Sequence, residues 1–369
     1  MPRATIDLAA LSHNLQRLRS FLTPGSQLLA AVKADAYGHG AARVARHLER
    51  RGVSWFGVAT PAEALELREA GIGGRILLFS PVRADVAELA ELGVDLTVTD
   101  LDSLTALRLP RTASAVRVHL KVDTGMGRLG CTRRQALPVA LAIARSKGVV
   151  LEGVWTHLAR ADETDPNPTH EQLVEFQRFL DELARAGVRP KMVHAANSAA
   201  LLRFPESHFD LVRPGISLYG YHAGETSVEL EPDLRPVMTV TAPATFVKRV
   251  ERETPISYGG TWRAARPTTI ATLRFGYADG YPRLLGNRGW VTLQSHSCPV
   301  VGRVCMDQLM VEVGPLTVLP GERAVIFGPQ GPGAGDLAEV IGTISYELLT
   351  RISRRVPRDY LPERDSDHQ

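Results

Sequence analysis

Short apolar runs alternate with helical patterns through the first part of the chain. Eight runs are rich in β-branched and other apolar residues, and they cover residues 28–32, 55–59, 75–79, 94–98, 116–122, 149–155, 191–195 and 211–219. Nearly continuous apolar character over so few residues is typical of parallel strands that are covered on both faces. We therefore expect eight buried parallel strands.

Amphipathic segments with helical spacing lie between these runs, most clearly at residues 41–50, 62–71, 84–93 and 171–187. Each reaches a glycine at or near its end, where a helix terminus favours a left-handed residue: Gly52, Gly71, Gly93 and Gly187. Asp7 is placed to cap a further helix ahead of the first strand. Eight strand–helix units in roughly 220 residues match a (β/α)8 barrel, although a doubly wound open sheet is the alternative.

The pattern changes near residue 235. Short apolar runs separated by Gly, Pro and Asn turns replace the helical patterns until near residue 340, and they cover residues 238–250, 268–275, 290–294, 299–304, 309–313 and 323–327. Such runs predict a mostly antiparallel β domain. We therefore expect an α/β protein with an N-terminal (β/α)8 barrel, 1–235, followed by a β-rich domain, 236–369.

Composition narrows the class of protein. The 369 residues are 44% hydrophobic and 22% charged, which is ordinary for a globular chain. The net charge of +3 comes from interspersed residues without a basic stripe, so we expect neither a nucleic-acid nor a membrane partner. Three scattered cysteines predict neither a disulfide framework nor a metal site. Without a recognisable signal peptide or an apolar stretch long enough to span a membrane, a cytoplasmic enzyme is expected.

Polar residues stand where the predicted strands end: Lys33, Lys121, His157, Asn197 with Ser198, and Arg213. Active sites of barrels form at the carboxyl ends of the strands. Taken singly, Lys33 could be a surface lysine that extends into solvent, and His157 a hydrogen-bonded structural histidine. Their convergence on one rim instead predicts a site for an anionic ligand that contains an amine with a perturbed pKa.

The last two strand ends suggest what the ligand is. Gly215 allows close approach to the backbone after strand eight, and Asn197–Ser198 opens a short helix after strand seven. Barrels commonly bind phosphate at these two loops. A phosphate site near a lone strand-end lysine suggests pyridoxal phosphate bound as a Schiff base. Nucleotide binding has no support, because neither glycine-rich nucleotide motif is present.

Seven motifs resemble the bacterial alanine racemases, which are pyridoxal-phosphate enzymes of fold type III. In the family's order they are AVKADAYGHG (31–40), KVDTGMGRLG (121–130), HAANSAA (194–200), RPGISLYG (213–220), ISYGGTWRA (256–264), GYADGYPR (276–283) and GRVCMDQLMV (302–311). The resemblance covers essentially the whole chain and both predicted domains.

The resemblance implies a reaction and two catalytic residues. The enzyme would interconvert L-alanine and D-alanine by moving the Cα proton between two bases, and so supply D-alanine for peptidoglycan. Lys33 would hold pyridoxal 5'-phosphate as a Schiff base and then act on one face of the substrate. Tyr258 would act on the other face, from the partner subunit of a homodimer with shared active sites. Unperturbed pKa values near ~10 would leave both groups protonated, so a nearby cation such as His157 or an arginine is expected to lower the pKa of the tyrosine.

The resemblance also implies the binding residues. Arg213 would contact the pyridine nitrogen and leave it unprotonated, which we expect to disfavour transamination, and Arg128 would bond the phenolic oxygen. The cofactor-binding set is Lys33, Tyr37, Arg128, His157, Asn197, Ser198, Arg213, Gly215, Ile216 and Tyr346, of which Tyr37, Ser198, Gly215, Ile216 and Tyr346 would hold the phosphate. The substrate-binding set is Arg128, Tyr277, Met306 and Asp307. Lys121 matches a position that is often carbamylated to N6-carboxylysine.

Several alternatives stand beside this interpretation. Tyr258 before two glycines is on its own more typical of a turn, Lys121 could be an ordinary ion-pair lysine, and Cys305 could be a reactive thiol but has no readable base. Rival functions are a serine or broad-specificity racemase, an amino-acid decarboxylase and a non-catalytic pyridoxal-phosphate-binding protein. The second domain argues against the last of these. The lack of a signal peptide argues against a periplasmic broad-specificity enzyme, and a pocket narrowed by Tyr346 favours alanine over serine.

Overall fold

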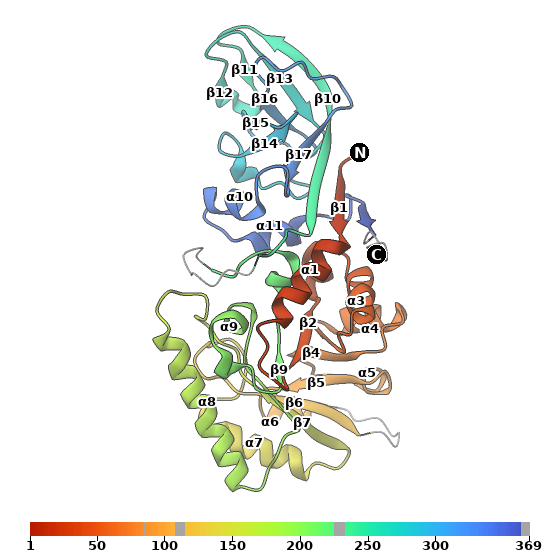
Figure 1. Ribbon diagram of the computed structural model, residues 1–369, viewed down its shortest axis with the longest axis vertical. Coiled ribbons are helices and arrows are strands. Elements are labelled where there is room, and N and C mark those ends of the chain that lie inside the picture. Colours follow the sequence, from red (N-terminus) through yellow and green to blue (C-terminus); the bar gives the residue numbers. More distant parts are fainter. Residues whose placement is uncertain (84–85, 108–114, 225–232, 363–369) are drawn as a thin grey trace, which may run out of the picture.

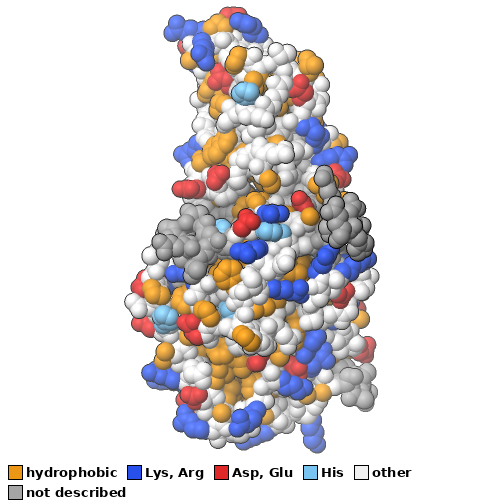
Figure 2. Space-filling model, in the orientation of Figure 1, with side chains coloured by type: hydrophobic (Ala, Val, Ile, Leu, Met, Phe, Trp, Pro, Cys, Tyr) orange, Lys and Arg blue, Asp and Glu red, His pale blue; other side chains and the backbone are white. Residues whose placement is uncertain are grey.

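The computed structural model describes residues 1–83, 86–107, 115–224 and 233–362. Two lobes follow each other along the long axis of the molecule (Figure 1), with the helix-covered sheet in one and the second sheet in the other. Charged side chains of both signs are scattered over the face shown in Figure 2. No helix in these residues is long and apolar enough to cross a membrane.

The first lobe is the predicted barrel. Its eight strands are β2 (Gln27–Ala31), β3 (Trp55–Val58), β4 (Arg75–Pro81), β5 (Val94–Val98), β6 (Val116–Lys121), β7 (Val149–Trp155), β8 (Met192–His194) and β9 (Leu211–Val212). They pair in parallel in the order β8-β7-β6-β5-β4-β3-β2-β9, which brings the last strand beside the first. The predicted run 211–219 is a strand only at its start, because Pro214 has no N–H to continue a ladder. A 3-10 turn, Ile216–Tyr219, follows it.

Helices surround these strands on the outside (Figure 1). They are α1 (Leu8–Arg19), α3 (Ala41–Arg50), α4 (Pro61–Glu69), α5 (Ala87–Glu91), α6 (Leu101–Thr105), α7 (Arg133–Arg145), α8 (Asn167–Arg185) and α9 (Ser198–Arg203), with a 3-10 turn at Pro205–Ser207. The Asp7 carboxylate caps α1 by accepting from the N–H groups of Ala9 and Ala10. The four predicted cap glycines all have φ between +68° and +79°. Both signals of helix ends are therefore confirmed.

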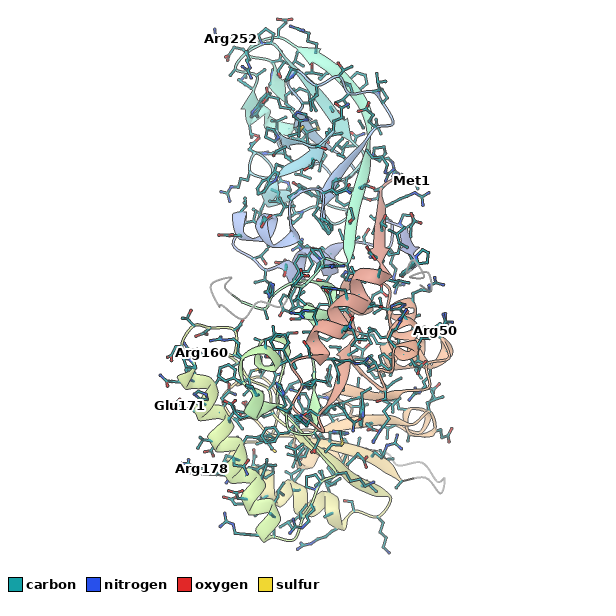
Figure 3. All side chains as sticks on the ribbon, viewed as in Figure 1. Met1, Arg50, Arg160, Glu171, Arg178 and Arg252 are labelled. Atoms are coloured by element: carbon teal, nitrogen blue, oxygen red, sulfur yellow. The ribbon has the colours of Figure 1, made fainter. Side chains whose placement is uncertain are left out.

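The second lobe is the predicted antiparallel domain. Its strands are β10 (Met238–Val250), β11 (Pro255–Ile256), β12 (Trp262–Arg263), β13 (Thr268–Leu273), β14 (Trp290–Leu293), β15 (His296–Pro299), β16 (Leu309–Glu312), β17 (Arg323–Phe327) and β18 (Arg358–Leu361). Its helices are α10 (Ala334–Val340) and α11 (Ser345–Arg351), with 3-10 turns at Tyr258–Gly260 and Arg283–Leu285. In Figure 3 the side chain of Arg252 lies at the far end of this lobe.

Two local predictions differ from the structure. The run 299–304 was expected to be a strand, but after β15 it keeps only a short pairing with β16, through a bridge from Val300 to Val311, before Gly302 turns the chain at φ +76°. The first strand, β1 (Arg3–Asp7), pairs with β10 and β18. It therefore belongs to the sheet of the second lobe, although the sequence pattern placed residues 1–235 in the barrel. Five residues carry too little pattern to show which distant strand they join.

The second lobe returns to the mouth of the barrel and packs on the segment α2 (Lys33–Gly38). A Cβ on Gly38 would lie 2.4 Å from the Leu349 carbonyl oxygen of α11, and one on Gly40 would lie 1.8 Å from the Tyr360 hydroxyl of β18. That hydroxyl donates to the His39 carbonyl over 3.0 Å. The glycines of the AVKADAYGHG motif are thus explained by the close contact between the two lobes.

Candidate active site

A cavity of about 810 Å³ opens at the carboxyl ends of the barrel strands. Every residue predicted from the sequence to contact the cofactor lines it, together with Lys121: Lys33, Tyr37, Lys121, Arg128, His157, Asn197, Ser198, Arg213, Gly215, Ile216 and Tyr346. The structure therefore brings the eleven residues together from seven separate parts of the chain.

Lys33 opens a turn of left-handed helix. Ala34, Asp35, Ala36 and Tyr37 all have φ between +52° and +54°. This conformation costs L-residues roughly 1–2 kcal/mol each, so strong local contacts must hold it. The Asp35 carboxylate accepts from the Ala41 N–H over 2.7 Å, which closes the end of the turn. Because of this winding, both Lys33 and Tyr37 line the cavity.

Glu63, which the sequence analysis did not single out, supports the start of this turn. Its carboxylate accepts from the Ala34 N–H over 2.7 Å and from the Ala59 N–H over 2.7 Å, one with each oxygen. It also completes a capping box with Thr60 at the start of α4. The TPAE spacing signals the capping box. Nothing in that signal shows that the same carboxylate reaches the turn after Lys33.

The surroundings of Lys33 favour its uncharged amine. Burial and the charge of Arg128 lower the pKa of Lys33, while the Glu63 carboxylate opposes the shift. A neutral amine is the form that attacks a carbonyl group or accepts a proton. The predicted amine with a perturbed pKa is therefore found at the strand end where the sequence placed it.

Lys121, the last residue of β6, is almost fully buried. Its Nζ donates to the Leu129 carbonyl over 2.8 Å and lies 4.9 Å from the centre of the Trp155 ring. Burial, followed by the charges of Arg128 and Arg213, lowers the pKa of Lys121 to about 8. An appreciable share of this amine is consequently neutral near physiological pH.

Arg128 stands on the loop between β6 and α7. Asp123 shapes this loop by accepting from the N–H groups of Gly125, Met126 and Gly127 at 2.9–3.1 Å. Within the described parts of the chain, the Arg128 guanidinium forms no hydrogen bond or ion pair. It is therefore available to an anionic group in the cavity.

Arg213 follows β9 directly and is 5% exposed. Its guanidinium donates to His194 Nδ1 and to the carbonyls of Thr156 and Ala195, each over 2.8 Å. Burial lowers its pKa to about 9, which still leaves it charged at neutral pH. This agrees with the expectation of a guanidinium that keeps its proton.

His157 differs from one expectation. It was considered as a cation that would lower the pKa of a tyrosine. Burial and the charges of Arg213 and Arg128 instead hold the pKa of His157 well below its usual range. The imidazole is neutral at physiological pH, so the prediction of a cationic His157 is wrong.

Hydroxyl and amide groups gather at another part of the cavity. The Ser198 hydroxyl accepts from the Gly215 N–H over 2.8 Å. A Cβ on Gly215 would lie 2.3 Å from the Tyr37 hydroxyl, which explains the glycine. The rings of Tyr37 and Tyr346 lie 5.9 Å apart, and burial raises the pKa of both phenols. Both phenols are therefore neutral and can donate hydrogen bonds.

Asn197 has a structural task in addition to lining the cavity. Its side-chain oxygen accepts from the Ala200 N–H over 3.0 Å and caps α9, and its amide donates to the Leu158 carbonyl over 3.1 Å. Both halves of the side chain are thus engaged within the protein.

Tyr258, Met306 and Asp307 lie elsewhere, around a second cavity of about 680 Å³ in the β-rich lobe. The Tyr258 side chain is 70% exposed and that of Met306 is 53% exposed. Tyr277 does not line this cavity but lies beside it: its N–H donates to the carbonyl of Cys305, the residue before Met306, over 3.0 Å. One chain therefore carries two separate groups of predicted site residues, and it does not bring Tyr258 to Lys33.

Two side chains at the second cavity, those of Cys305 and Asp307, show no arrangement typical of a nucleophile or a metal ligand within the part of the chain that the structure describes. Cys305 is a free thiol with the hydroxyl of Ser257 at 3.6 Å and no basic side chain in hydrogen-bond contact among the described residues. The Asp307 carboxylate pairs with Arg355 over 2.6 Å. In the described ranges, no group of three or more His, Cys, Asp or Glu side chains is arranged to hold a metal ion.

Comparisons with known proteins agree over nearly the whole chain. Residues 6–223 match the family described as alanine racemase, N-terminal domain, and residues 237–360 match alanine racemase, C-terminal domain. The alanine racemase of Desulforamulus reducens is 42% identical over 97% of this chain and 98% of its own length. The alanine racemase of Streptomyces lavendulae superposes with a TM-score of 0.90 at 40% identity and covers 100% of this chain and 99% of its own. A Bacillus anthracis alanine racemase with bound L-Ala-P gives 0.90 at 36% identity, with 98% and 95% covered.

Proposed function

The chain belongs to the alanine racemase family, isomerases that interconvert L-alanine and D-alanine, and on that premise we propose that it uses pyridoxal 5'-phosphate bound to Lys33. One observation carries the proposal. A lysine with a lowered pKa shares a cavity of about 810 Å³ with Arg213, Ser198 and Tyr37. An amine, a guanidinium and a set of hydroxyl donors are the groups that this cofactor requires.

The charges in the cavity fit an anionic cofactor and substrate. Lys33, Lys121, Arg128 and Arg213 stand there against the carboxylates of Asp162 and Glu347. Tyr37, Ser198, Gly215, Ile216 and Tyr346 would hold the phosphate, Arg213 with His157 and Asn197 would support the ring, and Arg128 would bond the phenolic oxygen. When bound, pyridoxal phosphate draws electron density away from the Cα of an amino acid joined to it, which makes the Cα proton acidic.

Two bases on opposite faces then move the proton. Lys33 Nζ takes or returns it on one face, and Tyr258 Oη does so on the other, so the substrate does not have to turn over. After one turnover one base holds the proton that it took and the other has given one up, so a proton must pass between them, directly or through solvent, before the next turnover in the same direction. Inversion removes a proton from one face and adds one to the other; a single mobile base could do both, but two fixed groups do so without moving.

Tyr258 would reach the site from a second copy of the chain. Within one chain it lines a different cavity from Lys33, and 70% of its side chain is exposed. Phe246 and Met306, which line the same cavity, are 57% and 53% exposed. We propose a head-to-tail homodimer in which these apolar side chains are covered and each barrel receives Tyr258 from its partner.

The substrate would lie between the two groups of residues. Arg128 and the backbone near Met306 would hold its carboxylate, with Tyr277 and Asp307 beside its path. Tyr346 would restrict the space around the substrate side chain and so favour alanine over serine. The product D-alanine would serve the assembly of peptidoglycan.

Lys121 would carry a carbamate. Its pKa of about 8 supplies the neutral amine that reacts with carbon dioxide. The resulting carboxylate would stand among Lys121's cationic neighbours Arg128 and Arg213 and would orient Arg128.

The test is exchange in heavy water. L-alanine and L-serine are incubated separately with the purified, cofactor-loaded protein, and deuterium at Cα and the D enantiomer are followed. We expect deuterium in both enantiomers of alanine and little from serine. Exchange on serine alone would keep the mechanism and overturn the substrate, and a protein that binds the cofactor without exchange on either amino acid would contradict the proposal.

A further inference from the structure

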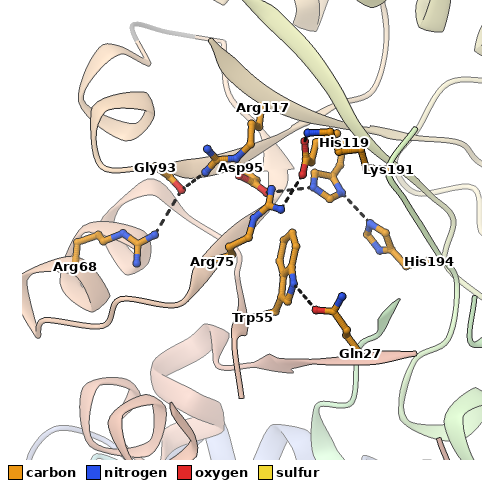
Figure 4. A network of polar contacts seen from close by, with 11 residues as sticks. Gln27, Trp55, Arg68, Arg75, Gly93, Asp95, Arg117, His119, Lys191 and His194 are labelled. Carbon is orange, nitrogen blue, oxygen red and sulfur yellow. Dashed lines mark hydrogen bonds and ion pairs between the residues drawn. The ribbon is translucent and has the colours of Figure 1, made fainter. Parts of the chain in front are cut away.

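A line of hydrogen bonds crosses the barrel interior beneath Arg213. Its guanidinium lies 2.8 Å from His194 Nδ1, His194 Nε2 lies 2.9 Å from His119 Nδ1, and His119 Nε2 lies 3.3 Å from the Asp95 carboxylate. Figure 4 shows the lower part of this line, from His194 to Asp95. The residues come from β8, β6 and β5, and the side chains of both histidines and Asp95 are completely buried.

The chemistry of arginine gives this line a direction. A guanidinium can only donate, so His194 Nδ1 must accept. A neutral His194 then carries its proton on Nε2 and donates it to His119 Nδ1. His119 in turn carries its proton on Nε2 and donates it to Asp95. Burial and the charge of Arg213 hold the pKa of His194 well below its usual range, in agreement with a neutral ring.

Asp95 is a fixed end point. Arg75 donates to it over 2.5 Å and Arg117 over 2.6 Å. Burial by itself would raise its pKa, but the hydrogen bond from His119 and the charges of the two arginines lower it overall. Arg75 also donates to the Glu152 carboxylate of β7 over 2.7 Å, so the arginine that holds Asp95 is itself held by β7. The carboxylate therefore stays charged and in place.

Residues of β7 make room for the imidazole ring of His119 and pack against that of His194. A Cβ on Gly153 of β7 would lie 2.2 Å from His119 Nδ1, so only glycine fits beside this imidazole. The ring of His194 is stacked on Trp155, with centres 5.7 Å apart and planes 6° apart. Neither ring can turn to exchange its two nitrogens without disturbing these neighbours.

We propose that Asp95, His119 and His194 are positioning residues for Arg213, joined in a one-directional hydrogen-bond chain that fixes the orientation of the guanidinium toward the cavity. A carboxylate that accepts from one imidazole nitrogen makes the other nitrogen a better acceptor, and the effect passes along the chain. Among the described residues no carboxylate contacts Arg213 directly. This inference rests on the proposed function only where Arg213 meets the cofactor.

The histidine tautomers are measured first, by 15N NMR with and without pyridoxal phosphate. Both His119 and His194 should be neutral with the proton on Nε2. This readout does not depend on catalysis, so it stands even if the racemase proposal fails. A proton on Nδ1 of either ring, or a doubly protonated ring, would overturn the chain.

Variants then test the effect on Arg213 in the loaded protein. Asp95→Asn places an amide N–H among three donors and should shift the absorption maximum of bound pyridoxal phosphate and lower kcat about tenfold, with a smaller change in KM. His194→Asn is the second variant, since its amide can face Arg213 but is too short to reach His119, and it should shift the spectrum likewise.

The control is His208→Phe, another completely buried histidine, which bonds Thr23 and Leu201. It should lower the melting temperature and leave the spectrum and kcat unchanged. If Asp95→Asn does not fold, the spectrum and kcat of His194→Asn test the proposal instead. If a folded variant keeps the wild-type spectrum and kcat, or if the control shows the same spectral shift, the three residues only pack the core and do not position Arg213.

Discussion

At the scale of single residues, burial among like charges lowers the pKa of the lysine amines in the barrel cavity. Lys33 and Lys121 both lose part of their proton affinity, and Arg128 contributes to each shift. The same surroundings keep His157 neutral. One crowded group of cations thus supplies amines of lowered pKa, a neutral imidazole and unshared positive charge for an anion.

Carbamylation of Lys121 should follow its titration. Because the neutral amine is the reactive form and the pKa is about 8, the carbamate at constant dissolved carbon dioxide should increase from about pH 7 to about pH 9. A 13C signal from labelled carbon dioxide measures it. Lys121→Gln should abolish the signal and lower the affinity for alanine. A signal that persists in this variant, or one that is unchanged over the pH range, would contradict the assignment.

At the scale of elements, the left-handed turn after Lys33 is held from outside. Ala34 to Tyr37 have no intrinsic preference for positive φ, and their conformation depends on Glu63 from α4 and on α11 of the other lobe. The turn directs a lysine and a tyrosine into one cavity.

Replacing Glu63 tests this dependence. In Glu63→Gln the amide oxygen can accept from one of the Ala34 and Ala59 N–H groups, while the NH2 group faces the other donor. We expect a loss of about 1–3 kcal/mol in unfolding free energy and weaker retention of pyridoxal phosphate. Chemical denaturation and cofactor titration measure the two effects. Glu66→Gln, an exposed position on the same helix, is the control, and equal effects from both variants would argue against this role.

The sequence predicted elements well where a pattern repeats and poorly where a contact is distant. Eight strands, the cap glycines and the strand-end residues followed from periodicity and from the geometry of barrels. The pairing of β1 with β10 and β18, the loop after β15 and the reach of Glu63 to Ala34 did not, because each depends on residues far along the chain. His119 and Asp95 were missed for a related reason. Inside a strand of mostly apolar residues, nothing in the pattern shows that they meet.

At the scale of the molecule, the chain carries two separate groups of proposed site residues on two lobes. Lys33 stands at the mouth of the barrel, whereas Tyr258 and Met306 line a separate, exposed cavity. Each lobe therefore carries the proposed site residues that the other lobe of a second chain lacks. A head-to-tail pair of chains would complete two sites by one symmetric contact.

Mixing two inactive variants tests this assembly most directly. Lys33→Ala and Tyr258→Phe chains are each purified, then dissociated and reassociated together, and alanine racemisation is measured. If each site takes Lys33 from one chain and Tyr258 from the other, a mixed pair contains one intact site. Random pairing should then restore about a quarter of the wild-type activity per chain. Activity that stays at the level of the separate variants, with mixed pairs demonstrably formed, would show that Tyr258 does not complete the partner's site and would contradict the account.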